Sequence, residues 1–420
     1  MPWCRREKWV NALVFALAVL AASPVAFAQS GDDEEGPPRV MNAHTAEIVI
    51  KASELVDTKN YAGARKVLGE LSLSQLNPYE RSRVELILAN IDNIQENYAT
   101  ARRHLQQAMA SGGLNAEETE RVRINIARLF MIEENWAAAA ALLEEWFRHA
   151  KNPDSIAYYL LAIAYYQLGD SARALAPAQK AVELMEKPQT AQMELLLALY
   201  LERKDYREAI ELNARMVETW PRNESYWLRL SSLYQAVENY DRALATLQVA
   251  YNAGYFTQDS QTLRLAELLQ FNHIPQRCAR ILEAALAGGA IEGTADSYEK
   301  LGNCWISARE FEKSIAPLRQ AAELSDDGNL YVRLAEVQLQ QGDWKGVASA
   351  VRNAIDKGDL DDSAHAQLMM GIALFKREEL AQARKWFARA ARDEDYRDNA
   401  TAYINAINAC AKDPEADWCG

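Results

Sequence analysis

The most reactive side chains in this sequence are five histidines and five cysteines. The histidines stand far apart, with no H-E-x-x-H pattern and no pair at helical spacing, so they do not indicate a hydrolytic metal site. The sequence also lacks a G-x-S-x-G turn, a Walker A loop, a G-x-G-x-x-G loop and a C-x-x-C pair. We therefore expect no catalytic site, no bound metal and no cofactor. The histidines are His44, His104, His149, His273 and His365.

Four cysteines remain if a predicted leader, residues 1–28, is removed, and an even number in an exported protein indicates disulfides. Cys278 falls on the second helix of one predicted helix pair, and Cys304 falls on the first helix of the next pair, which should pack beside it. Cys410 ends the last predicted helix, and Cys419 follows a proline turn. We predict the pairs Cys278–Cys304 and Cys410–Cys419. Four separate thiols, buried or free, are the alternative.

Helices must position these residues, and the clearest helical pattern lies at residues 226–250. Trp227, Leu230 and Tyr234 follow one face of a first helix. The polar pair Glu238–Asn239 then interrupts the apolar pattern, and a second helix follows. Two short helices cannot bury both apolar faces alone, so they need neighbours of the same kind. The apolar side of the second helix carries Tyr240, Ala243, Leu247 and Ala250.

The same helix pair recurs along the chain at intervals of 33 to 38 residues. A small or β-branched residue marks each second helix, and it is alanine in seven of the ten cases. An aromatic residue usually stands three positions earlier, directly after a polar pair. The marker positions are Ala64, Ala101, Ala139, Ala174, Ala209, Ala243, Cys278, Ser314, Val347 and Ala383. This pattern resembles the tetratricopeptide repeat over about residues 45–392, and the resemblance implies an all-α superhelical solenoid of about ten helix–turn–helix repeats.

The N-terminus is typical of a secretory signal peptide over residues 1–28. A basic start precedes an apolar stretch of about 13 residues, which is short against the roughly 20 that a membrane-spanning helix needs. Ala26-Phe27-Ala28 forms a cleavage site. An uncleaved membrane anchor is the alternative. We expect export to the periplasm and, after cleavage, no direct insertion into the membrane.

The rest of the chain divides by composition. Residues 29–40 are acidic and rich in glycine and proline, which predicts a flexible linker. We expect the solenoid at 41–397, a capping helix at 398–412 and a short tail at 413–420. The formal net charge of −13 disfavours nucleic acid or anionic lipid as the main partner.

The tetratricopeptide resemblance also implies a binding groove, because first-helix positions 2, 5, 9, 12 and 13 of such repeats usually face the concave side. The groove residues implied in this way are Arg121, Ile124, Arg128, Met131, Ile132, Ile156, Tyr159, Ile163, Tyr166, Leu228 and Gln235, and further on Glu267, Asp296, Glu299, Asn303 and Glu336. Such a groove is apolar and tyrosine-lined, with two arginines toward its N-terminal half, and becomes acidic later. It would suit an extended or helical segment with apolar anchors and some basic residues. The alternative is that the apolar members complete helix packing and that the arginines are solvated.

One known binding mode of such repeats is not implied. Leu86 and Asn90 stand where the carboxylate clamp of chaperone-binding repeat proteins would place its first Lys-Asn pair. The sequence therefore does not indicate binding of C-terminal chaperone tails.

A second resemblance concerns the segment from Met41 to Asn115, with Asn60-Tyr61-Ala62, Leu76-Asn77-Pro78 and Asn97-Tyr98-Ala99. Together with the secretory leader, it is similar to exported tetratricopeptide proteins of Gram-negative bacteria that accompany TonB–ExbB–ExbD systems. The resemblance implies a periplasmic scaffold that binds TonB, ExbB or ExbD and assists TonB-dependent energy transduction and transport. An assembly or secretion factor for outer-membrane proteins, using the same groove, is the alternative. An enzyme with its site in a loop is a third possibility.

Overall fold

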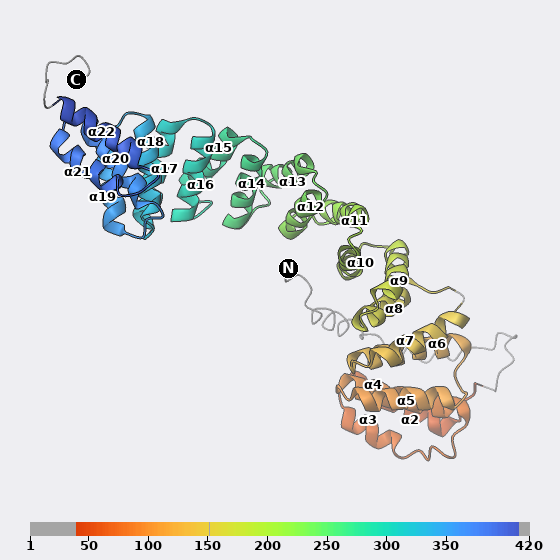
Figure 1. Ribbon diagram of the computed structural model, residues 1–420. Helices are drawn as coiled ribbons and strands as arrows, with labels where there is room; N and C mark the ends of the chain where they lie inside the picture. The colour runs from red at the N-terminus through yellow and green to blue at the C-terminus, as the bar shows by residue number, and fades with distance from the viewer. Residues whose placement is uncertain (1–38, 151, 411–420) are drawn as a thin grey trace. The chain divides into compact units, whose positions relative to one another are not determined.

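The computed structural model describes residues 39–150 and 152–410, and in these residues the regular structure is helical, with no strand. The helices form consecutive helix–turn–helix pairs, which confirms the predicted all-α repeat fold. The chain separates into two compact units at the bond between Thr219 and Trp220. Unit 1 holds five described pairs, and unit 2 holds five pairs and one further helix (Figure 1). The predicted signal peptide, most of the linker and the tail lie outside the described residues.

Unit 1 alternates first and second helices from the N-terminal side. Its pairs are α2 (Ala43–Asp57) with α3 (Tyr61–Leu68), α4 (Pro78–Ile94) with α5 (Tyr98–Ala110), α6 (Ala116–Ile132) with α7 (Trp136–His149), α8 (Ser155–Gln167) with α9 (Ser171–Glu183), and α10 (Thr190–Arg203) with α11 (Tyr206–Thr219).

Unit 2 continues the same alternation. Its pairs are α12 (Glu224–Ala236) with α13 (Tyr240–Asn252), α14 (Asp259–Phe271) with α15 (Pro275–Ala287), α16 (Ala295–Ser307) with α17 (Phe311–Leu324), α18 (Asn329–Gln340) with α19 (Trp344–Lys357), and α20 (Ser363–Lys376) with α21 (Leu380–Ala390), followed by α22 (Arg397–Cys410).

The polar pairs seen in the sequence build the turn inside each helix pair. The first residue of the turn adopts a positive φ, as Glu238 does at 58°, and this reverses the chain. In five of these turns the side chain of the next residue caps the second helix; the Asn239 side chain, for example, accepts the backbone N–H of Arg242 at 3.2 Å. Glycine fills the left-handed position in only two of the ten turns, at Gly169 and Gly342.

A cluster of ion pairs connects the N-terminal parts of α4 and α6 with Arg39. Glu118, in the first turn of α6, forms ion pairs with Arg39 and Arg83. Both guanidinium groups also lie over the ring of Tyr79, at 5.6 and 4.8 Å from its centroid. The Asn115 backbone N–H donates to the same carboxylate at 3.1 Å, which completes a capping box.

This cluster predicts a pH-dependent contribution to stability. Burial raises the pKa of Glu118, but the Arg83 hydrogen bond, the Asn115 amide and the two arginine charges outweigh burial and hold that pKa below its ordinary value of 4.5. A depressed folded-state pKa stabilises the fold above the unfolded pKa, and this stabilisation is lost as the pH falls through the folded pKa. We therefore expect Glu118→Gln to be less stable than the unmodified protein at neutral pH, with the difference shrinking at about pH 3. Urea unfolding at both pH values checks this; an equal difference at both would contradict it.

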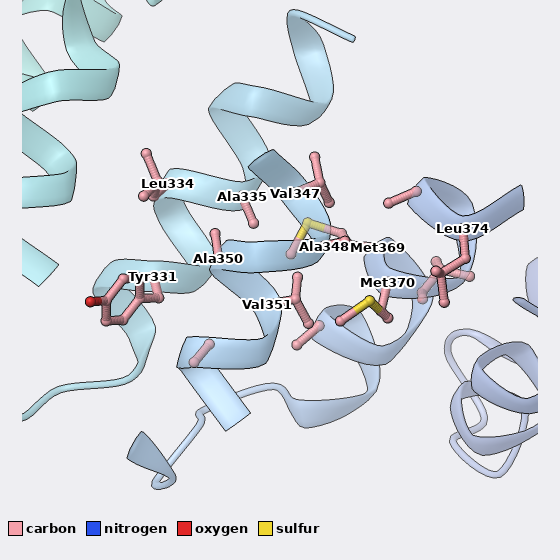
Figure 2. Close-up of a cluster of buried hydrophobic side chains, with 14 of the residues drawn as sticks. Tyr331, Leu334, Ala335, Val347, Ala348, Ala350, Val351, Met369, Met370 and Leu374 are labelled. Atoms are coloured by element: carbon pink, nitrogen blue, oxygen red, sulfur yellow. The ribbon is translucent and has the colours of Figure 1, made fainter. Parts of the chain in front are cut away.

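One hydrophobic core cluster of unit 2 lies between successive helix pairs from α17 to α22, and Figure 2 shows its part around α18, α19 and α20. Tyr331 and Leu334 of α18 pack against α19, and Met370 of α20 packs on the other side. Close approach of the helices depends on small residues where they cross. A Cβ added at Gly371 would lie 2.6 Å from the ring of Phe387, so a larger side chain would push α21 away from α20.

The last helix covers the end of this core. Helix α22 packs on α21, and the ring of Tyr403 stacks on that of Phe387 at 4.6 Å between centroids. Its position agrees with the predicted capping helix, although residues 411 and 412 lie outside the described part. A large apolar side chain at the end of the repeat stack is thereby shielded from water.

The structure also contains one of the two predicted disulfides. Cys278 of α15 and Cys304 of α16 are bonded, with their Cα atoms 5.9 Å apart and both side chains buried. The bond joins the second helix of one pair to the first helix of the next. The other predicted pair involves Cys419, which lies outside the described residues.

Candidate functional site

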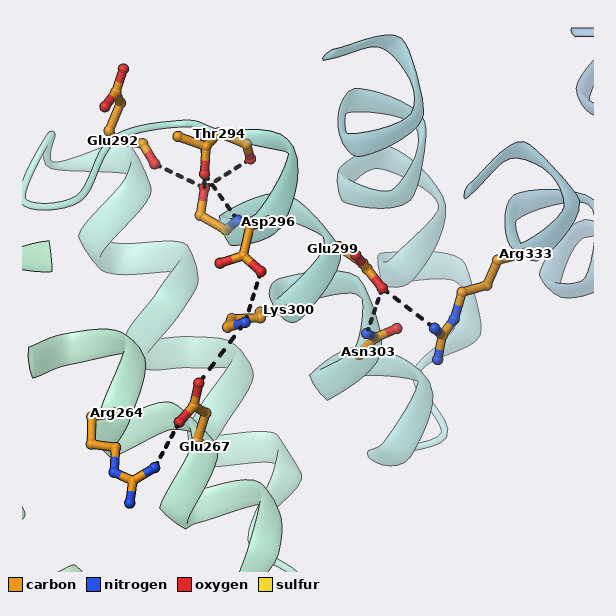
Figure 3. Close-up of polar contacts among 10 residues, drawn as sticks. Arg264, Glu267, Glu292, Thr294, Asp296, Glu299, Lys300, Asn303 and Arg333 are labelled. Carbon is orange, nitrogen blue, oxygen red and sulfur yellow. Dashed lines mark hydrogen bonds and ion pairs between the residues drawn. The ribbon is translucent and has the colours of Figure 1, made fainter. Parts of the chain in front are cut away.

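Side chains on the first helices of unit 2 make polar contacts from one first helix to the next, and we call this set of residues the unit 2 row. Arg264 and Glu267 of α14 are 3.2 Å apart, and Lys300 of α16 lies 3.9 Å from Glu267 (Figure 3). Lys300 also pairs with Asp296 at 2.8 Å. The row thus joins two neighbouring first helices through side chains of alternating charge.

The same row continues onto α18. Arg333 pairs across helices with Glu299 of α16 at 3.5 Å, and Asn303 donates to the same carboxylate at 3.5 Å (Figure 3). On the other side, Arg264 donates to Gln235 of α12 at 3.0 Å. The members of the unit 2 row are Gln235, Arg264, Glu267, Asp296, Glu299, Lys300, Asn303 and Arg333.

The sequence prediction missed the cations of this surface. It named the carboxylates as an acidic stretch, whereas Arg264, Lys300 and Arg333 balance three of them. Arg264, Lys300 and Arg333 each directly follow position 5 of their first helix, which is one of the predicted groove positions. Their i,i+3 or i,i+4 spacing from a carboxylate on the same helix was a usable signal for two of them.

The predicted groove residues of unit 1 divide into exposed and buried groups. The Arg121 side chain is 66 % exposed and lies 3.9 Å from the still more exposed Glu117, so this pair contributes little stability. Ile156 of α8 is 46 % exposed, and Ile124 of α6 is partly buried. These residues lie at the surface of α6 and α8. We call Arg121, Ile124, Arg128, Ile156 and Tyr159 the unit 1 row.

Other predicted groove residues lie in the interior. Met131 and Ile163 are 0 % and 1 % exposed, and Tyr166 is also buried. Leu228 belongs to unit 2, where it is partly buried against the core around α14 and α15. Their side chains therefore complete helix packing, the second of the two alternatives that the sequence left open, and they offer little surface to a partner.

Two polar side chains of the unit 1 row lack hydrogen-bond partners. The Nε atom of Arg128 is buried with no acceptor, and its Nη1 atom reaches only Asn125 at 3.4 Å. Burial lowers the pKa of Arg128, and the more distant charge of Asp154 opposes this. The Tyr159 hydroxyl is also buried without a partner, and burial raises its pKa.

A separate polar cluster is buried between α3, α4 and α5. The Nδ1 atom of His104 lies 2.6 Å from Glu85 and its Nε2 atom 3.5 Å from Asp92. Arg65 pairs with Asp92 at 2.6 Å. The two carboxylates are 3 % and 2 % exposed, so this cluster cannot meet a substrate from solvent.

Nowhere in residues 39–150 and 152–410 do three or more His, Cys, Asp or Glu side chains converge on a point that could hold a metal ion. Within the same residues, no helix has both the length and the hydropathy that crossing a bilayer requires.

Two stretches of the chain match the tetratricopeptide repeat. The family model described as "Tetratricopeptide repeat" matches residues 124–191 and residues 332–400, one stretch in each unit. No curated protein matches the chain. The repeat content agrees with the helix pairs described above and with the resemblance seen in the sequence.

Solved structures with a likeness to this chain include two titled as tetratricopeptide repeat proteins, and MamA. YrrB, titled a TPR protein with an unusual peptide-binding site, is 20% identical over 40% of this chain and 84% of its own, with a TM-score of 0.35. A tetratricopeptide repeat protein from Parabacteroides merdae is 18% identical over 62% of this chain and 98% of its own, with a TM-score of 0.38. MamA is 15% identical to this chain, covering 41% of this chain and 91% of its own, with a TM-score of 0.36. At these scores the likenesses add nothing to the assignment of a ligand.

Proposed function

We propose that this chain, which contains tetratricopeptide repeats, is an interaction scaffold that holds segments of partner proteins against its first helices. The observation that carries the proposal is the unit 2 row, in which polar contacts link neighbouring first helices, α14 to α16 through Glu267 and Lys300 and α16 to α18 through Glu299 and Arg333 (Figure 3). A surface built from regularly spaced helices presents contacts at regular intervals along a bound segment.

The energetics of the unit 2 row suit reversible binding. Arg264 and Glu267 are nearly half exposed, and the Asp296 side chain is 62 % exposed. Exposed ion pairs of this kind contribute less than about 1 kcal/mol each. Charged side chains of a partner can therefore replace these internal pairs at little cost to the fold. The alternating charge also favours a segment with charges of both signs over a uniformly basic one.

We further propose that the protein acts outside the cytoplasm, as an accessory of TonB-dependent transport. Three observations support this narrower proposal: the leader-like N-terminus, the likeness of residues 41–115 to exported proteins near TonB–ExbB–ExbD systems, and the Cys278–Cys304 disulfide. Disulfides persist mainly in oxidising compartments. In this role, TonB, ExbB or ExbD would supply the bound segment.

Photocrosslinking in cells tests the scaffold proposal. A photoreactive residue at Ile156 or Arg264, on first helices, should capture a discrete partner that mass spectrometry identifies. The matched controls are Glu145 on α7 and Arg280 on α15, which are exposed on second helices of the same units. Equal capture from the controls, or capture from them alone, would contradict the proposed binding face.

The identity of the captured protein tests the narrower proposal. Adducts with TonB, ExbB or ExbD would support it, and adducts with the assembly machinery of outer-membrane proteins would favour the alternative role. A deletion strain should also grow poorly when iron is scarce if the protein serves TonB-dependent uptake. Normal growth together with normal uptake would count against that role.

A further inference from the structure

Arg128 is an exception within the internal repeat. It stands eleven residues before the marker position of its second helix, and no other repeat has a cation there. The equivalent residues are Ser53, Asn90, Ile163, Ala198, Ser232, Glu267, Asn303, Glu336 and Ile372. Because nine repeats form the same helix pair without a cation at this position, folding of the pair does not require one.

Tyr159 is a second exception, on the neighbouring first helix. Its position in the repeat is occupied elsewhere by aliphatic residues or by glutamate. Its hydroxyl is buried and has no hydrogen-bond partner among the described residues. The equivalent residues are Val49, Leu86, Ile124, Glu194, Leu228, Leu263, Glu299, Val332 and Leu368.

The repeat geometry places Arg128 and Tyr159 side by side on neighbouring first helices of unit 1. Helices α6 and α8 are in direct contact. In unit 2, Glu267 occupies the repeat position of Arg128, and Lys300 occupies the position directly after that of Tyr159. Those two side chains meet at 3.9 Å across neighbouring first helices. The Arg128 side chain should therefore face α8 beside Tyr159.

In the free protein, neither the Nε–H group of Arg128 nor the hydroxyl of Tyr159 has a hydrogen-bond acceptor. A partly buried guanidinium group normally has a carboxylate partner, because a lone charge and a buried unpaired N–H are both costly. Asp154 acts on Arg128 only at longer range, and no ion pair with Arg128 occurs among the described residues. Residues that depart from the repeat pattern and lower the stability of the fold are expected at functional sites. At such a site, a ligand can supply the hydrogen-bond acceptor that the protein lacks.

We propose that Arg128 and Tyr159 form a subsite for one acidic side chain, aspartate or glutamate, within a polypeptide segment bound on the unit 1 row. The inference rests on the proposed scaffold function and adds the chemistry of the partner. The carboxylate accepts from the Arg128 guanidinium group and, after a side-chain rotation that exposes the Tyr159 hydroxyl, from that hydroxyl as well, while Ile124 and Ile156 offer apolar contacts to neighbouring residues. Within the unit 1 row, whose members are all described, Arg128 is the one cation without a carboxylate partner, which suits a single side-chain carboxylate inside a segment.

Selection from a peptide library tests the subsite. Random dodecapeptides would be displayed between fixed flanking sequences, so that neither peptide terminus is free, and selected on the full chain. We expect peptides selected by the unmodified protein to be enriched in aspartate or glutamate. Arg128→Gln should abolish that enrichment and weaken binding of a selected peptide about tenfold or more, the scale of a charge-assisted hydrogen bond. Tyr159→Phe should weaken the same peptide less, and Arg128→Lys should retain part of the acidic preference.

Arg148→Gln is the matched control, since Arg148 is exposed on α7 of the same repeat and should leave the selection unchanged. Enriched peptides without an acidic preference, or an acidic preference that survives Arg128→Gln, would overturn the subsite and leave the scaffold function standing. Enrichment only from a parallel library with free C-termini would also overturn it. Failure to enrich any peptide from either library would count against the scaffold function and, with it, the subsite.

Stability of the free protein provides a second readout. A structural arginine stabilises the fold, whereas an unpaired one does not. We therefore expect Arg128→Gln to unfold at the same temperature as the unmodified protein or a higher one. A melting temperature several degrees lower would show that Arg128 has a structural partner and would overturn the proposal.

Discussion

His104→Ala is expected to lower the free energy of unfolding by about 3 kcal/mol, the cost of leaving the buried Glu85 carboxylate without its hydrogen-bond partner. The imidazole ring lies between Glu85 at 2.6 Å and Asp92 at 3.5 Å, and both carboxylates are almost fully buried. Without the ring, Arg65 still pairs with Asp92, but Glu85 loses its nearest polar partner. Chemical denaturation of the full chain measures the effect.

The matched comparisons separate loss of the His104–Glu85 hydrogen bond from loss of side-chain volume. His149→Ala removes an exposed imidazole from α7 and should change stability by less than about 0.5 kcal/mol. Adding Glu85→Gln to His104→Ala should recover part of the loss, because the orphaned carboxylate is then gone. If both single histidine variants were equally stable, the buried cluster would not contribute as described.

This cluster also shows what the sequence could not predict. Glu85 and Asp92 occupy positions of the first helix where the other repeats mostly place aromatic or aliphatic residues, so the repeat pattern predicts an apolar contact there. The polar partners of these two carboxylates, Arg65 and His104, lie on two different second helices. Periodicity within one helix carries no information about such partners on other helices.

The helices themselves could be predicted, because their signals are local. The spacing of apolar residues predicts each helix, and a pair such as Glu238–Asn239 predicts the turn, through a left-handed residue followed by a helix cap. The small residue at each crossing predicts close packing of the pair. These signals recur ten times, so an error in one repeat is corrected by the others.

Exposure of the groove residues was harder to predict. Ile163 lies in the middle of α8, and α6, α7 and α9 all contact that helix, so its side chain is covered. Ile156, near the start of the same helix, remains half exposed. Both residues are isoleucines at positions named for the groove, and the difference arises from how neighbouring helices cover α8. A pattern of residue types cannot supply that information.

Removal of the disulfide by Cys278→Ser with Cys304→Ser is expected to lower the free energy of unfolding by about 3.5 kcal/mol. The bond closes a loop with a sequence separation of 26 residues, and the chain-entropy model gives this magnitude for such a loop. Both sulfur atoms are buried, and α15 and α16 pack along their length, so the variant should keep its helices and lose stability rather than fold. Urea unfolding of the full chain under oxidising conditions measures the difference.

Reduction of the unmodified protein provides the matching control. The denatured chain gains the same freedom whether the bond is reduced or replaced, so dithiothreitol should destabilise the unmodified protein by a similar amount and leave the double variant nearly unchanged. Hydrogen exchange should place the loss in α15 and α16 and spare unit 1, because the bond joins two helices within unit 2. A double variant as stable as the oxidised protein would show that helix packing alone holds these helices together. Oxidation would then matter little to the fold, and the disulfide would no longer support a role outside the cytoplasm.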